Sequence, residues 1–289
     1  MSYATTRIPR FSSKNGAVNY TSHAPIALAE LERIAPSVFA DGKHESRSER
    51  YAYIPTREVL GALVKEGFQP YSVLQGGSRD EGKRGFTKHL IRFRHESAAS
   101  VAGSHHTEVC LLNSHDGTSS YKLFAGVFRL VCSNGLVVAD GGLAEVRVPH
   151  TGDVTSRVVD GCIEVLGALP EVNDRVAEFY GLQLSQGERR LLATAALDAR
   201  FGDADAAPVT PDQVLTPHRR EDTSPDAWST LNVLQENLIR GGLRYVQRDD
   251  SGRRVAVRRT RATNSVDGNV GLNRALWRLT SEFAKLKAS

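Results

Sequence analysis

Hydrophobic and polar positions alternate along much of the first half of the chain, in short runs separated by turn residues. This period of two, with its β-branched and aromatic residues, is typical of β-strands. We expect strands at residues 51–54, 68–74, 87–95 and 144–148, with 109–112 as a candidate partner of the third. Asp116 and Gly117 form a tight-turn signal. Residues 121–138 stay open between a buried strand, a helix ending near Gly135, and one followed by the other.

Two early segments show the helical spacing of apolar residues instead. We expect a short helix at residues 27–34 and a second at 57–65. Thr56 is predicted to cap the second helix, and Gly67 to provide the left-handed residue after its end.

From about residue 151 the pattern becomes helical. Apolar residues between Val154 and Leu169 predict one long amphipathic helix that stops near Pro170, or continues through 172–180 beyond a kink. Residues 185–197 predict a second helix, with Leu191, Leu192 and Leu197 as core candidates.

The last part of the chain predicts a loop and two more helices. Residues 202–226 are rich in Asp, Pro and Thr and are typical of a loop. Ser224 and Pro225 form a helix-start signal, after which a helix is expected to run to Gly241. A final helix is expected from Asn273 to about Lys287.

Strands and helices therefore separate along the chain instead of alternating. This order predicts an α+β fold, with a mixed, largely antiparallel sheet region followed by a helical region. We expect residues 1–24 to be a loose N-terminal arm and 25–150 to form the sheet region. Residues 151–289 are expected to form a helical region with an Arg-rich hairpin, packed on the sheet as one domain.

Composition is that of a globular protein, with 40% hydrophobic and 24% charged residues, so a core can form. The three cysteines, Cys110, Cys132 and Cys162, are widely spaced and odd in number. That excludes a disulfide framework and favours a reducing compartment. The N-terminus has no apolar run of signal-peptide length, so we expect a cytoplasmic protein that binds no membrane.

Basic residues gather first between residues 83 and 94. If this segment is a strand, Lys88, Arg92 and Arg94 share one face with Phe86, and His89, Ile91 and Phe93 take the other. Positive charge beside an aromatic ring suits a nucleic-acid backbone with a stacked base, and a solvated sheet face is the alternative. The candidate contact residues are Lys83, Arg84, Phe86, Lys88, Arg92 and Arg94.

A second basic segment spans residues 244–261. It contains seven arginines against two aspartates, a net charge of +5, while the whole chain carries +4. Arginine binds phosphate in a bidentate manner, and Asp-Asp-Ser-Gly at the centre predicts a hairpin turn. A solubilising hairpin or a disordered arm is the alternative. The candidate contact residues are Arg244, Arg248, Arg253, Arg254, Arg258, Arg259 and Arg261.

No motif of a known enzyme or cofactor site stands out. The sequence has no phosphate-binding loop with lysine, no dinucleotide fingerprint and no GxSxG. The His105-His106 pair with Cys110 and His115 matches no zinc spacing, and the adjacent Ser114, His115 and Asp116 fit turn chemistry. The sequence therefore predicts no catalytic residue, no metal and no cofactor.

Three stretches together resemble a known family. They read YAYIPT at residues 51–56, GFTKHLIRFR at 85–94, and HDGTSSYK at 115–122 continuing into FRLVCSNGL at 128–136. They are similar to the phage- and plasmid-associated domain-of-unknown-function 932 family, over about residues 25–285, including Trp228 and the late arginines. The resemblance implies a protein carried by plasmids, phages or integrated elements, and implies no enzyme activity.

Three functional hypotheses follow. The first is non-enzymatic nucleic-acid binding in replication or recombination of a mobile element, with single-stranded DNA as one candidate ligand. The second is a protein-interaction factor, such as a host-defence antagonist. The third is an enzyme with a site built from His89, His115, Cys132 and Asn134. DNA versus RNA and homo-oligomerisation stay open.

Overall fold

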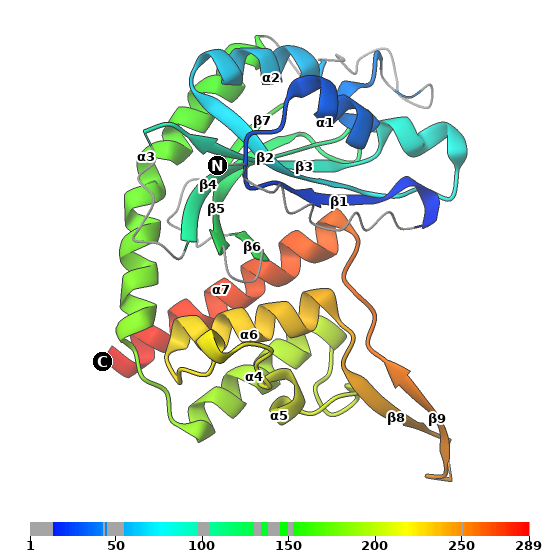
Figure 1. Cartoon of the computed structure of the whole chain (residues 1–289), viewed down its shortest axis with the longest axis vertical. Helices are drawn as coiled ribbons and strands as arrows, with labels where there is room; N and C mark the ends of the chain where they lie inside the picture. Colours follow the sequence, from blue (N-terminus) through cyan, green and yellow to red (C-terminus); the bar gives the residue numbers. More distant parts are fainter. Residues whose placement is uncertain are drawn as a thin grey trace, which may run out of the picture. The chain divides into compact units, whose positions relative to one another are not determined.

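The computed structural model describes residues 14–42, 44, 55–97, 105–129, 134–137, 145–149, 153–249 and 251–288. The chain divides into two compact units, residues 1–135 with 141–170, and residues 136–140 with 171–289. Strands dominate the first half and helices the second, which confirms the α+β prediction (Figure 1). The expected packing as one domain stays a prediction.

One sheet organises the first half of the chain. Its strands run in sequence order as an antiparallel meander, and the last strand returns to pair with the fifth. The strands are β1 (Val18–Thr21), β2 (Phe68–Gln75), β3 (His89–His95), β4 (His105–Asn113), β5 (Tyr121–Arg129), β6 (Asn134–Val137) and β7 (Val146–Val148).

The sequence does not predict the short strand β1. β1 falls inside the expected loose arm, where it pairs with β2 and the hydroxyls of Thr21 and Ser72 lie 3.0 Å apart. A four-residue edge strand is too short to show a period of two. The open segment 121–138 contains two strands, β5 and β6. The strand expected at 51–54 lies outside the described residues.

Helices α2 (Thr56–Lys65) and α3 (Val154–Gly181) pack on the same face of this sheet. The α2 residue Thr56 contacts Tyr121, and the α3 residue Gly161 leaves no room for a side chain beside Leu123, two positions along the same strand. The short helices α1 (Leu28–Ile34) and η2 (Pro36–Phe39) belong to the same unit (Figure 1).

The predicted cap of α2 is wrong, and the structure decides between the two alternatives for α3. Pro55, not Thr56, is the N-cap of α2, because the Thr56 hydroxyl lies 3.0 Å from His115 Nε2 inside the protein. α3 continues through residues 172–180, which confirms the second alternative, and it does not stop at Pro170. Pro170 stands on an exposed position while the buried stripe continues through Val172, so packing offsets the hydrogen bond lost at the proline. Gly67 has φ +86°, as predicted.

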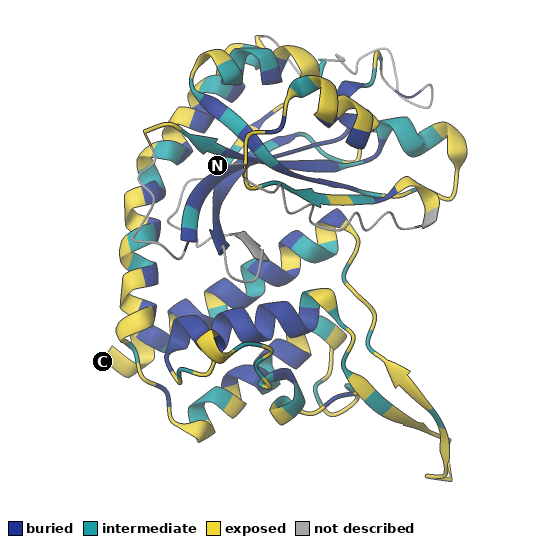
Figure 2. Ribbon diagram, in the orientation of Figure 1, coloured by how far each residue is buried: buried dark blue, intermediate teal, exposed yellow. Residues whose placement is uncertain are grey.

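The second unit is a helical core that carries a hairpin. Its elements are α4 (Gln186–Phe201), α5 (Pro211–Val214), η4 (Arg220–Asp222), α6 (Ala227–Arg240), β8 (Arg244–Arg248), β9 (Arg254–Arg259) and α7 (Val266–Ala288). α6 is the central helix, buried along almost its whole length (Figure 2). Trp228 of α6 and Trp277 of α7 are fully buried, and Gln235 donates to Asn273 Oδ1 at 2.6 Å between these helices.

Several boundaries in this unit differ from the sequence expectation. Asp226, not Ser224, caps α6, and its carboxylate accepts from the Ser229 amide at 2.7 Å. Leu191 is 61% exposed and is not a core residue, whereas Leu192 and Leu197 are buried. α7 begins at Val266, earlier than expected, and α5 and η4 lie within the expected loop. Among the described helices, none combines the length and hydropathy that a membrane crossing needs.

Candidate nucleic-acid interface

The basic segment 244–261 forms the hairpin that its sequence predicts. β8 and β9 pair antiparallel, with Tyr245 opposite Arg258 and Val246 opposite Val257. The turn is held by Asp249, whose carboxylate accepts from the side chain and amide of Ser251 and from the amide of Arg253. These hydrogen bonds, with that of the Ser251 hydroxyl foremost, lower the pKa of Asp249. These three hydrogen bonds to the Asp249 carboxylate stabilise the turn at the end of the hairpin.

The positive charge on this hairpin is exposed to solvent. All seven arginines are exposed, and the hairpin extends away from the helices of its unit (Figures 1 and 2). Within the described residues, no carboxylate forms an ion pair with any of them. Their hydrogen bonds go to neutral acceptors, as Arg248 to the Gly252 carbonyl at 2.8 Å and Arg259 to the Gly242 carbonyl at 3.2 Å. Charge of this kind is available to an anionic partner.

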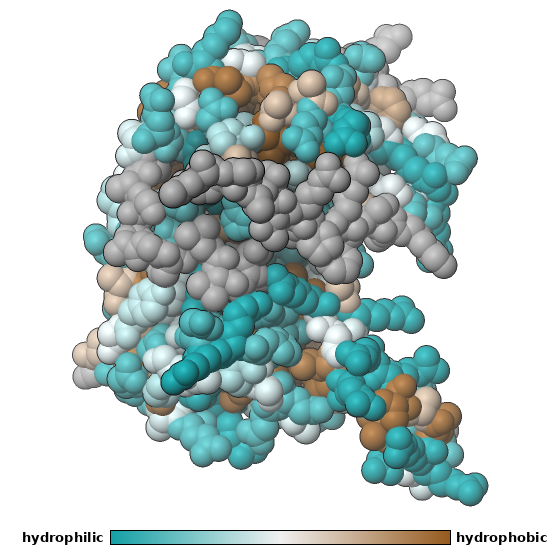
Figure 3. Space-filling view, in the orientation of Figure 1, coloured by the Kyte–Doolittle hydropathy of each residue, from teal (hydrophilic) through white to brown (hydrophobic). Residues whose placement is uncertain are grey.

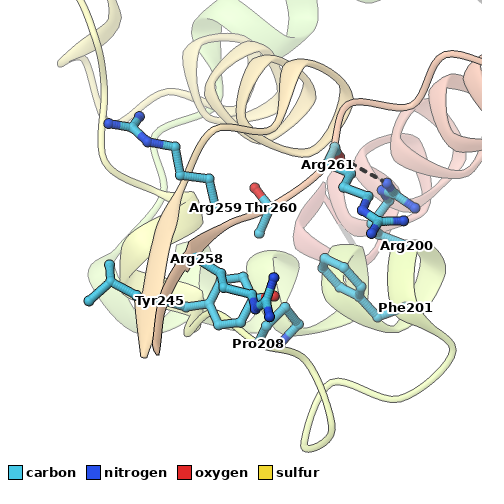
Figure 4. Close-up of a pocket in the computed structure, with 9 residues that line it drawn as sticks. Arg200, Phe201, Pro208, Tyr245, Arg258, Arg259, Thr260 and Arg261 are labelled. Atoms are coloured by element: carbon cyan, nitrogen blue, oxygen red, sulfur yellow. Dashed lines mark hydrogen bonds between the residues drawn. The ribbon is translucent and has the colours of Figure 1, made fainter. Parts of the chain in front are cut away.

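A pocket of about 530 Å³ lies where the hairpin meets the helices of the second unit (Figure 4). The end of α4, the following loop, both strands and the segment after β9 contribute to it. Arg200 donates to the carbonyl of Arg261 at 3.2 Å and to that of Leu238 at 3.3 Å. Its guanidinium carbon lies 5.3 Å from the Phe201 ring centroid. The lining residues are Arg200, Phe201, Pro208, Tyr245, Val257, Arg258, Arg259, Thr260 and Arg261.

Within this pocket the side chains differ in direction. Figure 4 shows the Arg200 and Arg261 side chains close to Phe201, whereas Arg259 points away from them. The Arg258 Nε donates to the side-chain oxygen of Gln247, its neighbour on the same face of the hairpin. Arg200, Arg258 and Arg261 thus give the pocket three guanidinium groups. Arg200 and Phe201 carry no signal in the sequence that links them to the hairpin.

The first basic segment is divided differently. Lys83 and Arg84 lie in η3 (Glu81–Phe86), before the strand, and each forms an ion pair, with Asp80 at 3.9 Å and with Glu81 at 2.8 Å. Phe86 is half-buried, with its ring centroid 5.4 Å from that of His44. Lys88 is half-buried and precedes β3. Lys83, Arg84 and Phe86 therefore lie outside the strand that carries Arg92 and Arg94.

The strand arginines of this segment are held inside the first unit. Arg92 is 5% exposed, and its Nε lies 2.5 Å from Oε2 of the buried Glu108. Arg94 Nε lies 2.9 Å from the other oxygen of the same carboxylate, and its guanidinium stacks 4.1 Å from the Tyr71 ring centroid and 4.9 Å from that of Phe128. Arg92 and Arg94 do share a face, as the alternation predicts. Because that face is buried, we leave both residues out of the interface proposed below.

The histidines of the enzyme hypothesis come together in part. His89 and His115 are both buried, with ring centroids 5.4 Å apart. Burial, and then the neighbouring His115, lower the pKa of His89 to about 3, so it is neutral at pH 7. Cys132 lies outside the described residues, and the side chain of Asn134 is not described. In the described part of the chain, no three His, Cys, Asp or Glu residues gather as metal ligands would.

Comparison with known proteins gives one family. The model of the family "Domain of unknown function (DUF932)" matches residues 43–277. Two proteins of Escherichia coli (strain K12), "UPF0380 protein YafZ" and "UPF0380 protein YfjQ", are each 48% identical over 271 residues. Each alignment covers 93% of this chain and 95% of the relative. No solved structure matches this chain.

Proposed function

This chain belongs to the DUF932 family, and we propose that it is a nucleic-acid-binding protein whose basic hairpin contacts phosphate groups. The observation that carries the proposal is the set of seven exposed arginines on and just after a two-stranded ribbon, without a carboxylate partner in the described residues. Ordinary solvated surfaces interleave arginine with acidic residues, as this chain does at Arg33 and Glu30, or at Arg190 and Asp212. The hairpin departs from that pattern.

Arginine is suited to this role because its planar guanidinium donates two parallel hydrogen bonds to a phosphate. Residues on one face of a strand are spaced at about 6.6 Å, so successive arginines can contact successive anionic groups. Arg244 and Arg259 are cross-strand partners, as are Arg248 and Arg254. The pairs place positive charge on both strands along the hairpin. We propose binding without catalysis, since phosphate contact alone requires no reactive side chain.

We place this binding in replication or recombination of a mobile element. That part of the proposal rests on the association of the resembled family with plasmids and phages. The hairpin itself supports only the contact with nucleic acid.

A second candidate function is docking of an acidic partner protein. Val246, Val255 and Val257 are exposed on the hairpin. Figure 3 shows a hydrophobic patch on the hairpin between hydrophilic neighbours. An apolar centre with an arginine rim is typical of protein interfaces. A partner retained by the protein in nuclease-treated lysate supports this alternative, and loss of all partners on nuclease treatment supports nucleic-acid binding.

Charge reversal tests the proposal. The test variant replaces Arg253, Arg254, Arg258 and Arg259 with Glu. The matched control makes the same change in net charge at exposed arginines elsewhere, Arg33, Arg79, Arg220 and Arg278. Fluorescence anisotropy with labelled DNA and RNA, on protein freed of bound nucleic acid, measures the affinity, and circular dichroism confirms folding.

We expect the hairpin variant to lose affinity by at least about 100-fold. The variant loses the contacts of four arginines with phosphate and gains four carboxylates that repel the phosphates. The control should lose much less, since its four arginines lie outside the hairpin. Equal losses in the two variants would show that net charge alone drives binding and would remove the hairpin from the account.

A further inference from the structure

The pocket below the hairpin contains the two features that an unpaired nucleotide needs, aromatic rings and unneutralised guanidinium groups. Phe201, at the end of α4, is 36% exposed, although a phenylalanine in a globular unit is usually buried. Tyr245 lies opposite Arg258 in the hairpin and lines the same pocket. Rings at the surface beside arginines can stack a base, and such stacking tolerates any sequence.

Arg200 is preoriented for this task. Its Nε and one Nη donate to the carbonyls of Leu238 and Arg261, and its guanidinium lies over the Phe201 ring. A guanidinium has five N–H donors, so this arrangement holds the group still and leaves donors for a ligand. Fixing a side chain before binding reduces the entropy lost on binding.

The remaining guanidinium groups of the pocket complete an anion site. Arg258 donates to the neutral Gln247, and no hydrogen bond or ion pair engages the Arg261 side chain within the described part of the chain. Around Phe201 the pocket therefore carries positive charge without an internal counterion. Such charge favours a ligand with a phosphate beside its aromatic group.

From this arrangement we infer that the pocket takes one unpaired base together with its phosphate, so that the preferred ligand is a single-stranded nucleic acid. The inference rests on the proposed function and adds the strand type. A pocket of about 530 Å³ falls in the range of small-molecule sites and admits a nucleotide. A duplex keeps its bases paired and stacked, and presents only its backbone to such a pocket unless a base is flipped out.

The chain around the pocket favours a polymer over a free nucleotide. The exposed arginines of β8 and β9 continue from the pocket along the hairpin, beyond the reach of a single nucleotide. A strand with one base in the pocket can place its next phosphates along these arginines. Linked contacts of this kind raise affinity above that of each contact alone.

Binding measurements with ring variants test the inference. The variants are Phe201→Ala with Tyr245→Ala, Phe201→Leu with Tyr245→Leu as apolar non-aromatic replacements, and Phe201→Tyr with Tyr245→Phe, which keep both rings. Anisotropy is recorded with a labelled single strand of about 20 nucleotides, longer than the ~4–16 nucleotide sites of single-strand-binding domains, and with a duplex of the same length. Thymidine monophosphate serves as the competitor that represents a free nucleotide.

We expect the wild-type protein to bind the single strand at least about 10-fold more tightly than the duplex. The alanine and leucine pairs should lose about 10–100-fold for the single strand and under about 3-fold for the duplex, because stacking is lost and backbone contacts remain. The ring-keeping pair should bind like the wild type. The duplex affinity that the alanine and leucine pairs retain shows that their loss is not a folding defect. Thymidine monophosphate should displace the strand only at millimolar concentration.

Equal wild-type affinity for single strand and duplex, or ring variants that keep single-strand affinity, would overturn this inference while the hairpin proposal stands. Displacement by micromolar thymidine monophosphate would likewise overturn it in favour of a nucleotide site. Absence of binding to either nucleic acid would overturn the proposed function as well.

Discussion

Glu108 is predicted to be essential for the stability of the first unit. Its carboxylate is buried and accepts hydrogen bonds from Arg92 at 2.5 Å and from Arg94 at 2.9 Å. In Glu108→Gln the two guanidinium groups lose the buried carboxylate that both of them contact. Removing one partner of a buried ion pair costs about 3–5 kcal/mol, because the remaining charge is desolvated and unpaired. We therefore expect the free energy of unfolding to fall by about that amount.

Urea denaturation followed by circular dichroism measures this change. With a slope of about 2 kcal/mol per molar urea, the midpoint should fall by about 1.5–2.5 M. Glu30→Gln is the control, since Glu30 is exposed and lies 4.0 Å from Arg33, where an ion pair contributes under about 1 kcal/mol. A Glu108→Gln protein within about 1 kcal/mol of the wild type would refute the reasoning, because Arg92 and Arg94 would then have access to water.

Three further predictions follow from single contacts. Gly67→Ala should destabilise the protein by about 1 kcal/mol or more, since φ is +86° and the added carbon meets the His95 ring at 2.9 Å. Gly61 lies within α2, and an added carbon there meets open space. Gly61→Ala should therefore stabilise the protein by about 0.5–1 kcal/mol. Asp226→Ala should cost about 1–2 kcal/mol through loss of the α6 cap, as measured by urea denaturation. His89 is neutral when folded and charges only when unfolded, so its contribution to stability is full above the unfolded pKa of about 6.5 and declines as the pH falls from there toward about 3. Between pH 7 and pH 5, protonation of His89 in the unfolded state should lower the free energy of unfolding by about 2 kcal/mol. The free energy of unfolding of His89→Gln should fall by about 2 kcal/mol less over the same interval. Equal losses in the two proteins would contradict the prediction.

The sequence predicts elements whose stabilising contacts are local. Alternation predicts the strands β2 and β3, and the Asp-Asp-Ser-Gly turn predicts the hairpin, because Asp249 binds amides only two and four residues away. Helix ends are harder to predict, since tertiary contacts override local preference. Thr56 turns inward to His115 instead of capping α2, and α3 passes Pro170 because its buried stripe continues.

In the candidate site, too, the features that depend on neighbouring residues can be predicted from the sequence, and those that depend on tertiary contacts cannot. The arginine cluster of the hairpin is visible in the sequence, because its members are neighbours there. The pocket is not, because Arg200 and Arg261 are 61 residues apart and meet only through the fold. The spacing of Arg92 and Arg94 predicts that they share a face, but only the pairing of β3 with β4 brings Glu108 beside them. Spacing within a strand does not say what the neighbouring strand contributes.

The most direct test of the central claim is the dependence of binding on salt for the wild-type protein. If about five of the seven hairpin arginines each neutralise one phosphate of a single strand, log K against log salt should have a slope of about −3.5. Affinity should then fall about 100-fold between 50 and 200 mM potassium chloride. A slope near zero with affinity retained at high salt would contradict the account, because contacts between arginine and phosphate cannot produce it.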